Sequence, residues 1–332
     1  MKKRNFLVTG GTGFIGSALV RRLVTRSHGV RVLDNDVRGN RSRVSDLLDR
    51  IEVINGDVRD IEAVTAAARG VDCLVHLAAI NGTANFYSRP ELVLDVGIMG
   101  MYASLQAARR CGVRNFVLAS SSEVYQEAAE VPTGEAVPLV VPDPWNPRYS
   151  YGGSKLISEI MLANYHADFF ERVVIVRPHN VYGPDMGVDH VLPQFILRAH
   201  KLIATYPEGV VPFPIQGDGQ QTRSFLHIDD FIDGLMLVIE KGVHRNTYHI
   251  GSSEELKIVD VAHIVFGWFN RNCEIISYPD KLPRGGTRRR CPNIEKMSIF
   301  GFAPKITLKE GMGSIGSWYV SNAAHLTPDN AM

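Results

Sequence analysis

The stretch Thr9-Gly10-Gly11-Thr12-Gly13-Phe14-Ile15-Gly16 decides the fold of this 332-residue chain. It follows the apolar run 5–9, which is typical of a buried strand, and it opens the amphipathic run 13–25, which is typical of a helix. Glycines at every third position let the backbone approach a pyrophosphate, and the helix N-terminus supplies N–H groups and a positive dipole. A glycine turn is common by itself, but one placed between a strand and a helix predicts a dinucleotide site.

Short apolar runs and longer amphipathic runs alternate through the first half of the sequence, which predicts βαβ units. Strands are expected at 30–34, 51–55, 73–77, 116–120 and 172–177, and helices at 60–68, 91–111 and 149–170. We therefore expect an α/β fold with a Rossmann-type, doubly wound parallel sheet and a smaller C-terminal α+β substrate lobe. The expected dinucleotide-binding Rossmann domain covers 1–177 and is joined by about 222–242, the lobe covers 178–221 and 243–320, and 321–332 is a frayed tail.

The composition is close to neutral, with 36 Lys and Arg residues against 35 Asp and Glu residues. This balance predicts neither a nucleic-acid partner nor a membrane surface. No run of about 18 apolar residues suggests a membrane span, and no secretory leader is evident. Four well-separated cysteines indicate reduced thiols in a cytoplasmic protein, and no metal site is expected.

Asp34 ends the second predicted strand about 20 residues after the glycine turn. A carboxylate there accepts hydrogen bonds from both ribose hydroxyls of NAD and repels the 2′-phosphate of NADP. Arg38, Arg41 and Arg43 follow, and an Arg nearby can favour NADP, so the sequence leaves that alternative open. We expect the NAD site to comprise Gly10, Gly13, Phe14, Ile15, Gly16, Asp34, Asn35, Asp57, Val58, Leu77, Ala78, Ala79, Tyr151, Lys155 and Pro178.

Tyr151 and Lys155 lie four residues apart in a helical pattern and so share one face. An ammonium near a phenol lowers the pKa of the phenol and makes it a base for a sugar hydroxyl. Packing on a helix surface explains such a pair equally well. The run Ser120-Ser121-Ser122-Glu123 follows the fifth strand, where ligands bind in parallel sheets, although three serines also suit a turn or a helix cap.

Together these motifs resemble the extended short-chain dehydrogenase/reductase family, in its nucleotide-sugar epimerase/dehydratase branch. The resemblance covers roughly residues 4–315 and includes TGGTGFIG, GDV, HLAA, SSSEVY, YGGSK, the run 177–184 and the run 219–225. It implies that Ser121, Tyr151 and Lys155 are catalytic and that Glu123 moves a second proton. It implies a nucleotide-diphosphate sugar as substrate. The substrate-binding residues that we expect are Ser122, Asn180, Arg223 and Arg290, although the run 288–290 also suits a solvated basic loop.

The family shares oxidation of the sugar C4 hydroxyl, and its members then epimerise, dehydrate or decarboxylate the sugar. Our main hypothesis is an NAD-dependent epimerase/dehydratase, and the alternatives are a UDP-glucuronate-type decarboxylase or an NAD(P)-dependent reductase. Asp95, Met99, Gln126 and His179 depart from the residues common in relatives. The resemblance also implies a homodimer built from 91–111 and 149–170, for which we expect Leu105, Ile157 and Met161 to supply apolar contacts.

Overall fold

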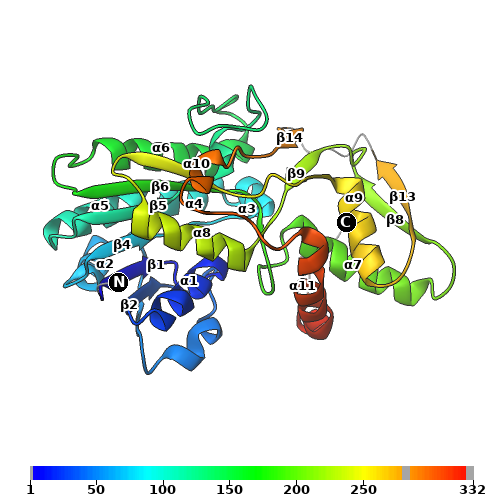
Figure 1. Cartoon of the computed structure of the whole chain (residues 1–332), viewed down its shortest axis with the longest axis horizontal. Coiled ribbons are helices and arrows are strands. Elements are labelled where there is room, and N and C mark those ends of the chain that lie inside the picture. The colour runs from blue at the N-terminus through cyan, green and yellow to red at the C-terminus, as the bar shows by residue number, and fades with distance from the viewer. Residues whose placement is uncertain (1–2, 279–284, 327–332) are drawn as a thin grey trace.

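Seven parallel strands form the main sheet, in the order β11-β6-β5-β4-β1-β2-β3 (Figure 1). The computed structural model describes residues 3–278 and 285–326. The strands of this sheet are β1 (Asn5–Thr9), β2 (Gly29–Asp34), β3 (Glu52–Asn55), β4 (Cys73–His76), β5 (Asn115–Ala119), β6 (Arg172–Pro178) and β11 (Asn246–Ile250). This is the expected Rossmann-type sheet, and the predicted fold class is confirmed.

Helices cover both faces of the sheet because successive side chains of each strand point to opposite faces. The helices of the main unit are α1 (Phe14–Thr25), α2 (Ile61–Ala68), α3 (Thr83–Ser88), α4 (Pro90–Leu94), α5 (Gly100–Arg110), α6 (Ser150–Asn164), α8 (Ile228–Lys241) and α10 (Glu295–Ser298). A π-helical turn at Asp95–Met99 joins α4 to α5, so the helix expected over 91–111 is one continuous, locally widened run.

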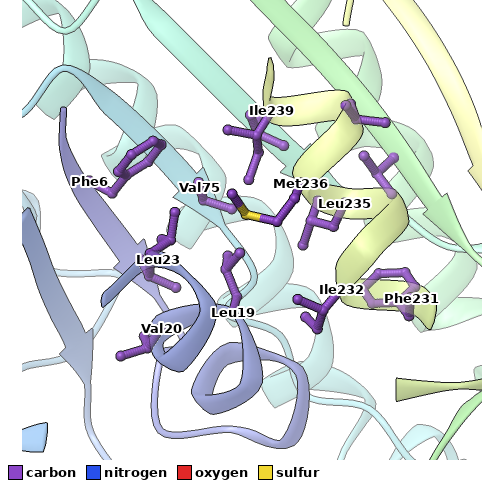
Figure 2. Packing of buried hydrophobic residues seen from close by; sticks show 14 of the residues in the cluster. Phe6, Leu19, Val20, Leu23, Val75, Phe231, Ile232, Leu235, Met236 and Ile239 are labelled. Carbon is purple, nitrogen blue, oxygen red and sulfur yellow. The ribbon is translucent and has the colours of Figure 1, made fainter. Parts of the chain in front are cut away.

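Two hydrophobic cores hold these layers together. On one face, Phe6 and Val8 of β1 pack against α1 and α8, whose side chains Leu19, Leu23 and Ile239 are seen between the helices in Figure 2. On the other face, Leu7 of the same strand packs among residues of α2, α5 and α6. All the residues of β1 from Phe6 onward are fully buried, as expected for a central strand covered on both sides.

The strand order reverses at β1, which lies between β2 and β4. Thr9, the last residue of β1, is therefore in register with Leu33 near the end of β2 and with His76 at the end of β4. At such a switch point the connections leave in opposite directions and open a crevice at the carboxyl ends of the strands. The glycine turn, Asp34 and the residues after His76 all follow these strand ends.

A smaller unit lies beside the sheet (Figure 1). Its core contains Phe213, Val265 and Ile315 and joins β8 and β13 to α7, α9 and α11. A three-stranded sheet, in the order β12-β9-β14, lies between this unit and the main sheet. The elements are β7 (Val181–Tyr182), α7 (Val191–Thr205), β8 (Val211–Gln216), β9 (Thr222–Ser224), β10 (Leu226–His227), β12 (Glu255–Lys257), α9 (Ile258–Trp268), β13 (Cys273–Tyr278), β14 (Arg289–Arg290) and α11 (Leu308–Asn322).

Several boundaries differ from the sequence-based expectation. The segment 246–250, expected in the substrate lobe, forms β11 and pairs with β6 in the main sheet. Its five residues carry no motif that names a partner strand, and only the pairing with β6 identifies it. The helix expected over 149–170 ends at Asn164. The expected frayed tail is ordered as far as a short 3-10 turn at Ala323–His325, and the rest of the tail, 327–332, lies outside the described residues. Within 3–278 and 285–326, no helix is long and apolar enough to cross a membrane.

Candidate active site

The glycine turn forms a cradle of the kind a pyrophosphate needs. Gly10 adopts a φ of +74°, and a Cβ atom there would lie 2.8 Å from the backbone nitrogen of Ala78. A Cβ atom on Gly16 would lie 2.0 Å from the carbonyl oxygen of Gly10. Gly13 is the N-cap of α1 and offers no side-chain cap, so the first N–H groups of the helix remain available to an anion. These residues fit the diphosphate of a dinucleotide.

The Asp34 carboxylate lies at the rim of this cradle. Its Oδ2 atom accepts a hydrogen bond from the Thr12 backbone at 3.0 Å, and its Oδ1 atom accepts one from the Asp36 backbone at 3.0 Å. These bonds fix the carboxylate beside the turn and leave each oxygen with further acceptor capacity for a ribose hydroxyl. The position fits NAD.

Two of the three arginines that left NADP open have acidic partners on a distant loop. Arg38 pairs with Asp189 at 3.0 Å. Arg43 donates two hydrogen bonds to the Asp185 carboxylate, at 2.6 and 2.8 Å. These ion pairs join the loop after β2 to the segment that leads into α7. They give both guanidinium groups an acidic partner within the chain, and Arg41 is exposed.

The other expected cofactor residues line the same edge of the sheet. Asn35 donates a hydrogen bond to Asp57 at 3.3 Å, and a hydrogen bond from Arg59 lowers the pKa of Asp57. Val58 is buried, and Ala78 backs directly onto Gly10. Phe14 and Ile15 are the first residues of α1, Leu77 and Ala79 flank Ala78 after β4, and Pro178 ends β6.

Ser121, Tyr151 and Lys155 converge at the end of β5. Ser121 follows this strand, caps the next 3-10 turn at Ser122–Val124 and hydrogen-bonds to the phenol of Tyr151. Lys155 lies one helical turn after Tyr151, with its Nζ atom 5.9 Å from the centre of the phenol ring. All three side chains are buried, at 9%, 7% and 3% exposure.

The charge relation between Tyr151 and Lys155 differs from the expectation. Lys155 donates its hydrogen bond to the Ala119 carbonyl at 2.7 Å, and burial lowers the pKa of its ammonium to about 8. Burial raises the pKa of Tyr151, and the hydrogen bond from Ser121 opposes this rise. Phe86 contributes to this burial because its ring stacks on that of Tyr151 with centroids 5.0 Å apart. The protein alone therefore keeps this phenol protonated.

Glu123 lies among three arginines. Arg290 donates a hydrogen bond to it at 2.7 Å, and Arg148 lies 3.4 Å from each of its carboxylate oxygens. Arg223 adds a third positive charge nearby. Burial by itself would raise the pKa of Glu123, but Arg290 and then Arg148 outweigh it and lower the pKa to about 2. Glu123 is thus held as a carboxylate in a cluster with a surplus of positive charge.

Arg290 reaches this cluster because of strand geometry. It lies opposite Arg223 in the parallel pair β14–β9, and neighbouring side chains on a strand point to opposite faces. Arg290 is accordingly buried at 8% exposure, whereas Arg289 pairs with Glu255 at the surface. The run 288–290 is therefore not a uniform solvated loop.

The remaining expected substrate residues lie close by. Asn180 donates a hydrogen bond to the Ser224 carbonyl at 2.8 Å, next to Arg223, and adopts a φ of +35°. Arg223 donates to the carbonyl of Thr222 at 2.7 Å, and burial together with Arg290 lowers its pKa to about 10. Ser122 is buried between Ser121 and Glu123. The structure thus places Arg223 and Arg290 near Glu123, Ser122 beside it in the chain, and Asn180 against the residue that follows Arg223.

Unsatisfied polar atoms mark the same region. Within the described part of the chain, buried atoms without a hydrogen-bond partner include Nη1 of Arg148, Nε of Arg290 and the hydroxyl oxygens of Ser120 and Ser150. A buried N–H group without an acceptor is costly, so such atoms are expected where a ligand supplies the partner. The two guanidinium nitrogens in this set are donors and suit an anion.

Comparison with known proteins identifies the family of this chain. Residues 6–251 match the sequence profile of the family described as "NAD dependent epimerase/dehydratase family". This chain belongs to the NAD dependent epimerase/dehydratase family. The resemblance found from the motifs is thereby confirmed, and so are the expectations of an enzyme and of NAD as its cofactor.

Similar members of the epimerase/dehydratase family include decarboxylases and a dehydratase. The chain is 31% identical to UDP-glucuronic acid decarboxylase 4 of Arabidopsis thaliana over 92% of its length, but it spans only 66% of that relative. It is 29% identical to UDP-N-acetyl-alpha-D-glucosaminuronate decarboxylase of Bacillus cytotoxicus, over 96% of this chain and 98% of the relative. The dTDP-glucose 4,6-dehydratase DesIV of Streptomyces venezuelae, solved with NAD and TYD bound, superposes with a TM-score of 0.84 at 28% identity, over 98% and 99% of the two chains.

Sequence reasoning missed three residues of this family site. Arg148 could have been found from the sequence, because it lies three residues before Tyr151 at the start of the same helical segment. Phe86 and Thr287 had no motif to mark them, and each reaches the site through a contact between distant segments that only the fold creates.

Proposed function

We propose that this enzyme decarboxylates a nucleoside-diphosphate-linked hexuronic acid after transient oxidation of its C4 hydroxyl. The observation that carries the proposal is the group of three arginines, Arg148, Arg223 and Arg290, around the single carboxylate of Glu123. A substrate with a sugar carboxylate and a diphosphate brings the anions that such a surplus of positive charge attracts. The similarity to two decarboxylases adds support.

The chemistry of the sugar explains why a cluster of cations is enough for decarboxylation. A C4 ketone next to a C5 carboxylate is a β-keto acid, which loses carbon dioxide without needing a base. The bond between C5 and the carboxylate breaks, its electron pair forms an enolate with the C4 ketone, and C5 takes a proton from water before the hydride returns to C4. The site must then hold the carboxylate in place, and the N–H groups of Arg148 and Arg290 that lack a partner suit that task. Loss of water would need a base at C5 and an acid at C6. Glu123, with a pKa lowered to about 2, is a weak base, and its neighbour Ser122 is not an acid.

The first step is assigned to the residues at the end of β5. When bound in the glycine cradle, NAD supplies a positive charge and accepts and returns the C4 hydride. We propose that Tyr151 takes the proton from the C4 hydroxyl and that Ser121 positions the sugar oxygen. Lys155, buried one turn away, favours the phenolate once the site is filled. Asn180 and Arg223 are proposed to hold the diphosphate.

The epimerase/dehydratase activities remain the alternatives that an experiment must separate. The purified enzyme is incubated with UDP-glucuronate, UDP-glucose and UDP-N-acetylglucosamine, and the products are analysed by mass spectrometry and NMR. We expect UDP-glucuronate to lose the mass of carbon dioxide and the two neutral sugars to remain unchanged. Loss of water from a neutral sugar would overturn the proposal in favour of a dehydratase. New sugar signals at unchanged mass would instead indicate a 4-epimerase.

We also propose a homodimer through the helices expected for it, with different contact residues. Leu105 and Met161 are buried within the chain and cannot supply the contact. Ile157 and Ile160 of α6 are 38% and 53% exposed, and Met99 on the neighbouring π-helical turn is 49% exposed. Apolar side chains exposed on adjacent helices suit a partner surface. A cytoplasmic location stays a prediction.

A further inference from the structure

Gln126 follows Tyr125 in a buried and closely defined place. It is buried at 4% exposure and adopts a φ of +51°, a region that glycine enters more readily than other residues. Its Nε2 atom donates a hydrogen bond to the Glu123 carbonyl at 2.6 Å. Its own carbonyl accepts a hydrogen bond from the Thr287 hydroxyl at 3.0 Å.

Thr287 connects this backbone to Arg290. The Thr287 hydroxyl donates its single proton to Gln126 and accepts a hydrogen bond from Nη2 of Arg290 at 2.8 Å. A hydroxyl can fill both roles at once. Because a guanidinium is planar and rigid, fixing Nη2 also fixes the direction of Nη1, which donates to Glu123 at 2.7 Å. The contacts run from Glu123 through Gln126, Thr287 and Arg290 and return to the carboxylate of Glu123.

The charged and titratable groups that face Glu123 come from four elements. They are Arg290 on β14, Arg148 on the 3-10 turn Pro147–Tyr149, Arg223 on β9 and Tyr151 on α6. Glu123 forms a short ion pair with Arg290, at 2.7 Å, and a longer one with Arg148, at 3.4 Å. The position of Arg290 therefore has the larger effect on the charge of Glu123.

We propose that Thr287, supported by Gln126, is a positioning residue that holds the Arg290 guanidinium against Glu123 at the substrate sugar. The proposal rests on the proposed function only in placing this ion pair at the sugar. Thr287 acts through Arg290, to which its hydroxyl is hydrogen-bonded. Thr287 is buried, at 4% exposure, and its hydroxyl group carries the effect.

The test compares Thr287→Val with Thr287→Ser in the NAD-loaded enzyme, using the nucleotide sugar that the unmodified enzyme converts. Valine keeps the shape but removes the hydroxyl. Arg290 then loses the partner of one arm, its contact with Glu123 weakens, and burial raises the pKa of Glu123. As the pH falls, the carboxylate becomes protonated and activity is lost. We expect the acidic limb of the kcat profile to lie at a higher pH in Thr287→Val than in the unmodified enzyme, and Thr287→Ser to restore it.

Thr133→Val serves as the matched control. Thr133 is also buried, at 3% exposure, but its hydroxyl donates to the Glu130 carbonyl at 2.9 Å and does not touch Arg290. We expect no shift of the acidic limb in this variant. If Thr287→Val does not fold, Thr287→Ala removes the hydroxyl without adding bulk and replaces it in the comparison, with circular dichroism as the check on folding.

A profile of the hydroxyl-free variant that coincides with that of the unmodified enzyme would overturn the proposal. So would an equal shift in Thr287→Ser, or in Thr133→Val, because each would indicate a general effect on the fold. The outcome is separate from the proposed reaction. The product of the unmodified enzyme decides between decarboxylation and its alternatives. The shift of the acidic limb between variants reports on Thr287, whichever product forms.

Discussion

Arg290 donates a hydrogen bond to Glu123 across 2.7 Å, although the two residues are 167 positions apart in the chain. Glu123 follows the fifth strand of the dinucleotide-binding sheet, and Arg290 lies on a two-residue strand of the small sheet beside it. Their contact joins the two parts of the molecule at the place where the sugar is expected to react. It also changes the role expected of Glu123, from a residue that exchanges protons to a carboxylate fixed among cations.

Replacing Glu123 by Gln should separate the first chemical step from the second. The amide keeps the shape of the side chain but leaves Arg290 and Arg148 without their counter-charge. The oxidative step does not depend on it, so a single turnover should still show a transient absorbance at 340 nm. Formation of product should fall by about tenfold or more, because Arg290 loses the charge-assisted hydrogen bond that holds it in place. Glu255→Gln, which removes the partner of the exposed Arg289, is the control and should have little effect. Unchanged turnover by Glu123→Gln with a product of unchanged mass would favour a 4-epimerase.

Replacing Tyr151 by Phe should stop the reaction before that step. The ring can keep its stacking on Phe86, but the hydroxyl that hydrogen-bonds to Ser121 is lost. Removal of a positioned base costs about 10²–10⁴-fold in rate, so both the 340 nm signal and the product should disappear together. Tyr165→Phe, at the exposed end of α6, provides a control. A 340 nm transient at the normal rate in Tyr151→Phe would show that another group is the base.

Asp34 should determine the choice of cofactor. We expect NAD to bind at least about tenfold more tightly than NADP, a difference of about 1.4 kcal/mol, because the carboxylate repels a 2′-phosphate. Asp34→Asn keeps an acceptor for the Thr12 backbone but removes the charge. This variant should narrow the difference between the affinities for NAD and NADP. Asp36→Asn is the matched control, since Asp36 bonds to the Thr12 hydroxyl. Equal affinities in titrations of the unmodified enzyme would contradict the prediction and implicate Arg41.

Arg223 should act on the substrate and not on the cofactor. Arg223→Ala removes one of the cations that we place at the diphosphate, so KM for the nucleotide sugar should rise by about tenfold or more, since a charge-assisted hydrogen bond is lost. NAD binding should stay within about twofold, because the glycine cradle lies at the end of β1. The control is Arg289→Ala. Arg289 lies on the adjacent strand β14 and pairs with Glu255 at the surface, so this variant should leave KM unaltered. Loss of NAD binding in Arg223→Ala would show that the assignment of Arg223 is wrong.

The oligomeric state provides the fifth prediction. Ile160→Glu places a charge on the exposed apolar face of α6, where Ile160 is 53% exposed. A dimer through this face should dissociate, and light scattering at micromolar concentration should then report the mass of a single chain. Val243→Glu changes a side chain of similar exposure, 57%, away from α6 and should not alter the mass. An unmodified enzyme that is already a monomer would reject the dimer.

The sequence by itself determined the dinucleotide half of the protein, because the signals there are local. A buried strand, a glycine turn and a helix follow one another within 21 residues, from Asn5 to Thr25, and hydrophobic periodicity marks each of them. Tyr151 and Lys155 share a helix, so their spacing alone places them on one face. The strand bounds Asn5–Thr9 agree with the prediction for the same reason.

The tertiary structure decided everything that depends on pairing between distant segments. No local pattern assigns 246–250 to the main sheet, pairs Arg43 with Asp185, or sends Arg290 inward and Arg289 outward. The charge of Glu123 depends on Arg148 and Arg290, which lie 25 and 167 residues away. Periodicity reports which face of an element is buried, but not which element covers it. The family is therefore evident in local motifs, whereas the electrostatics that distinguish one reaction from another arise where separate strands and loops meet.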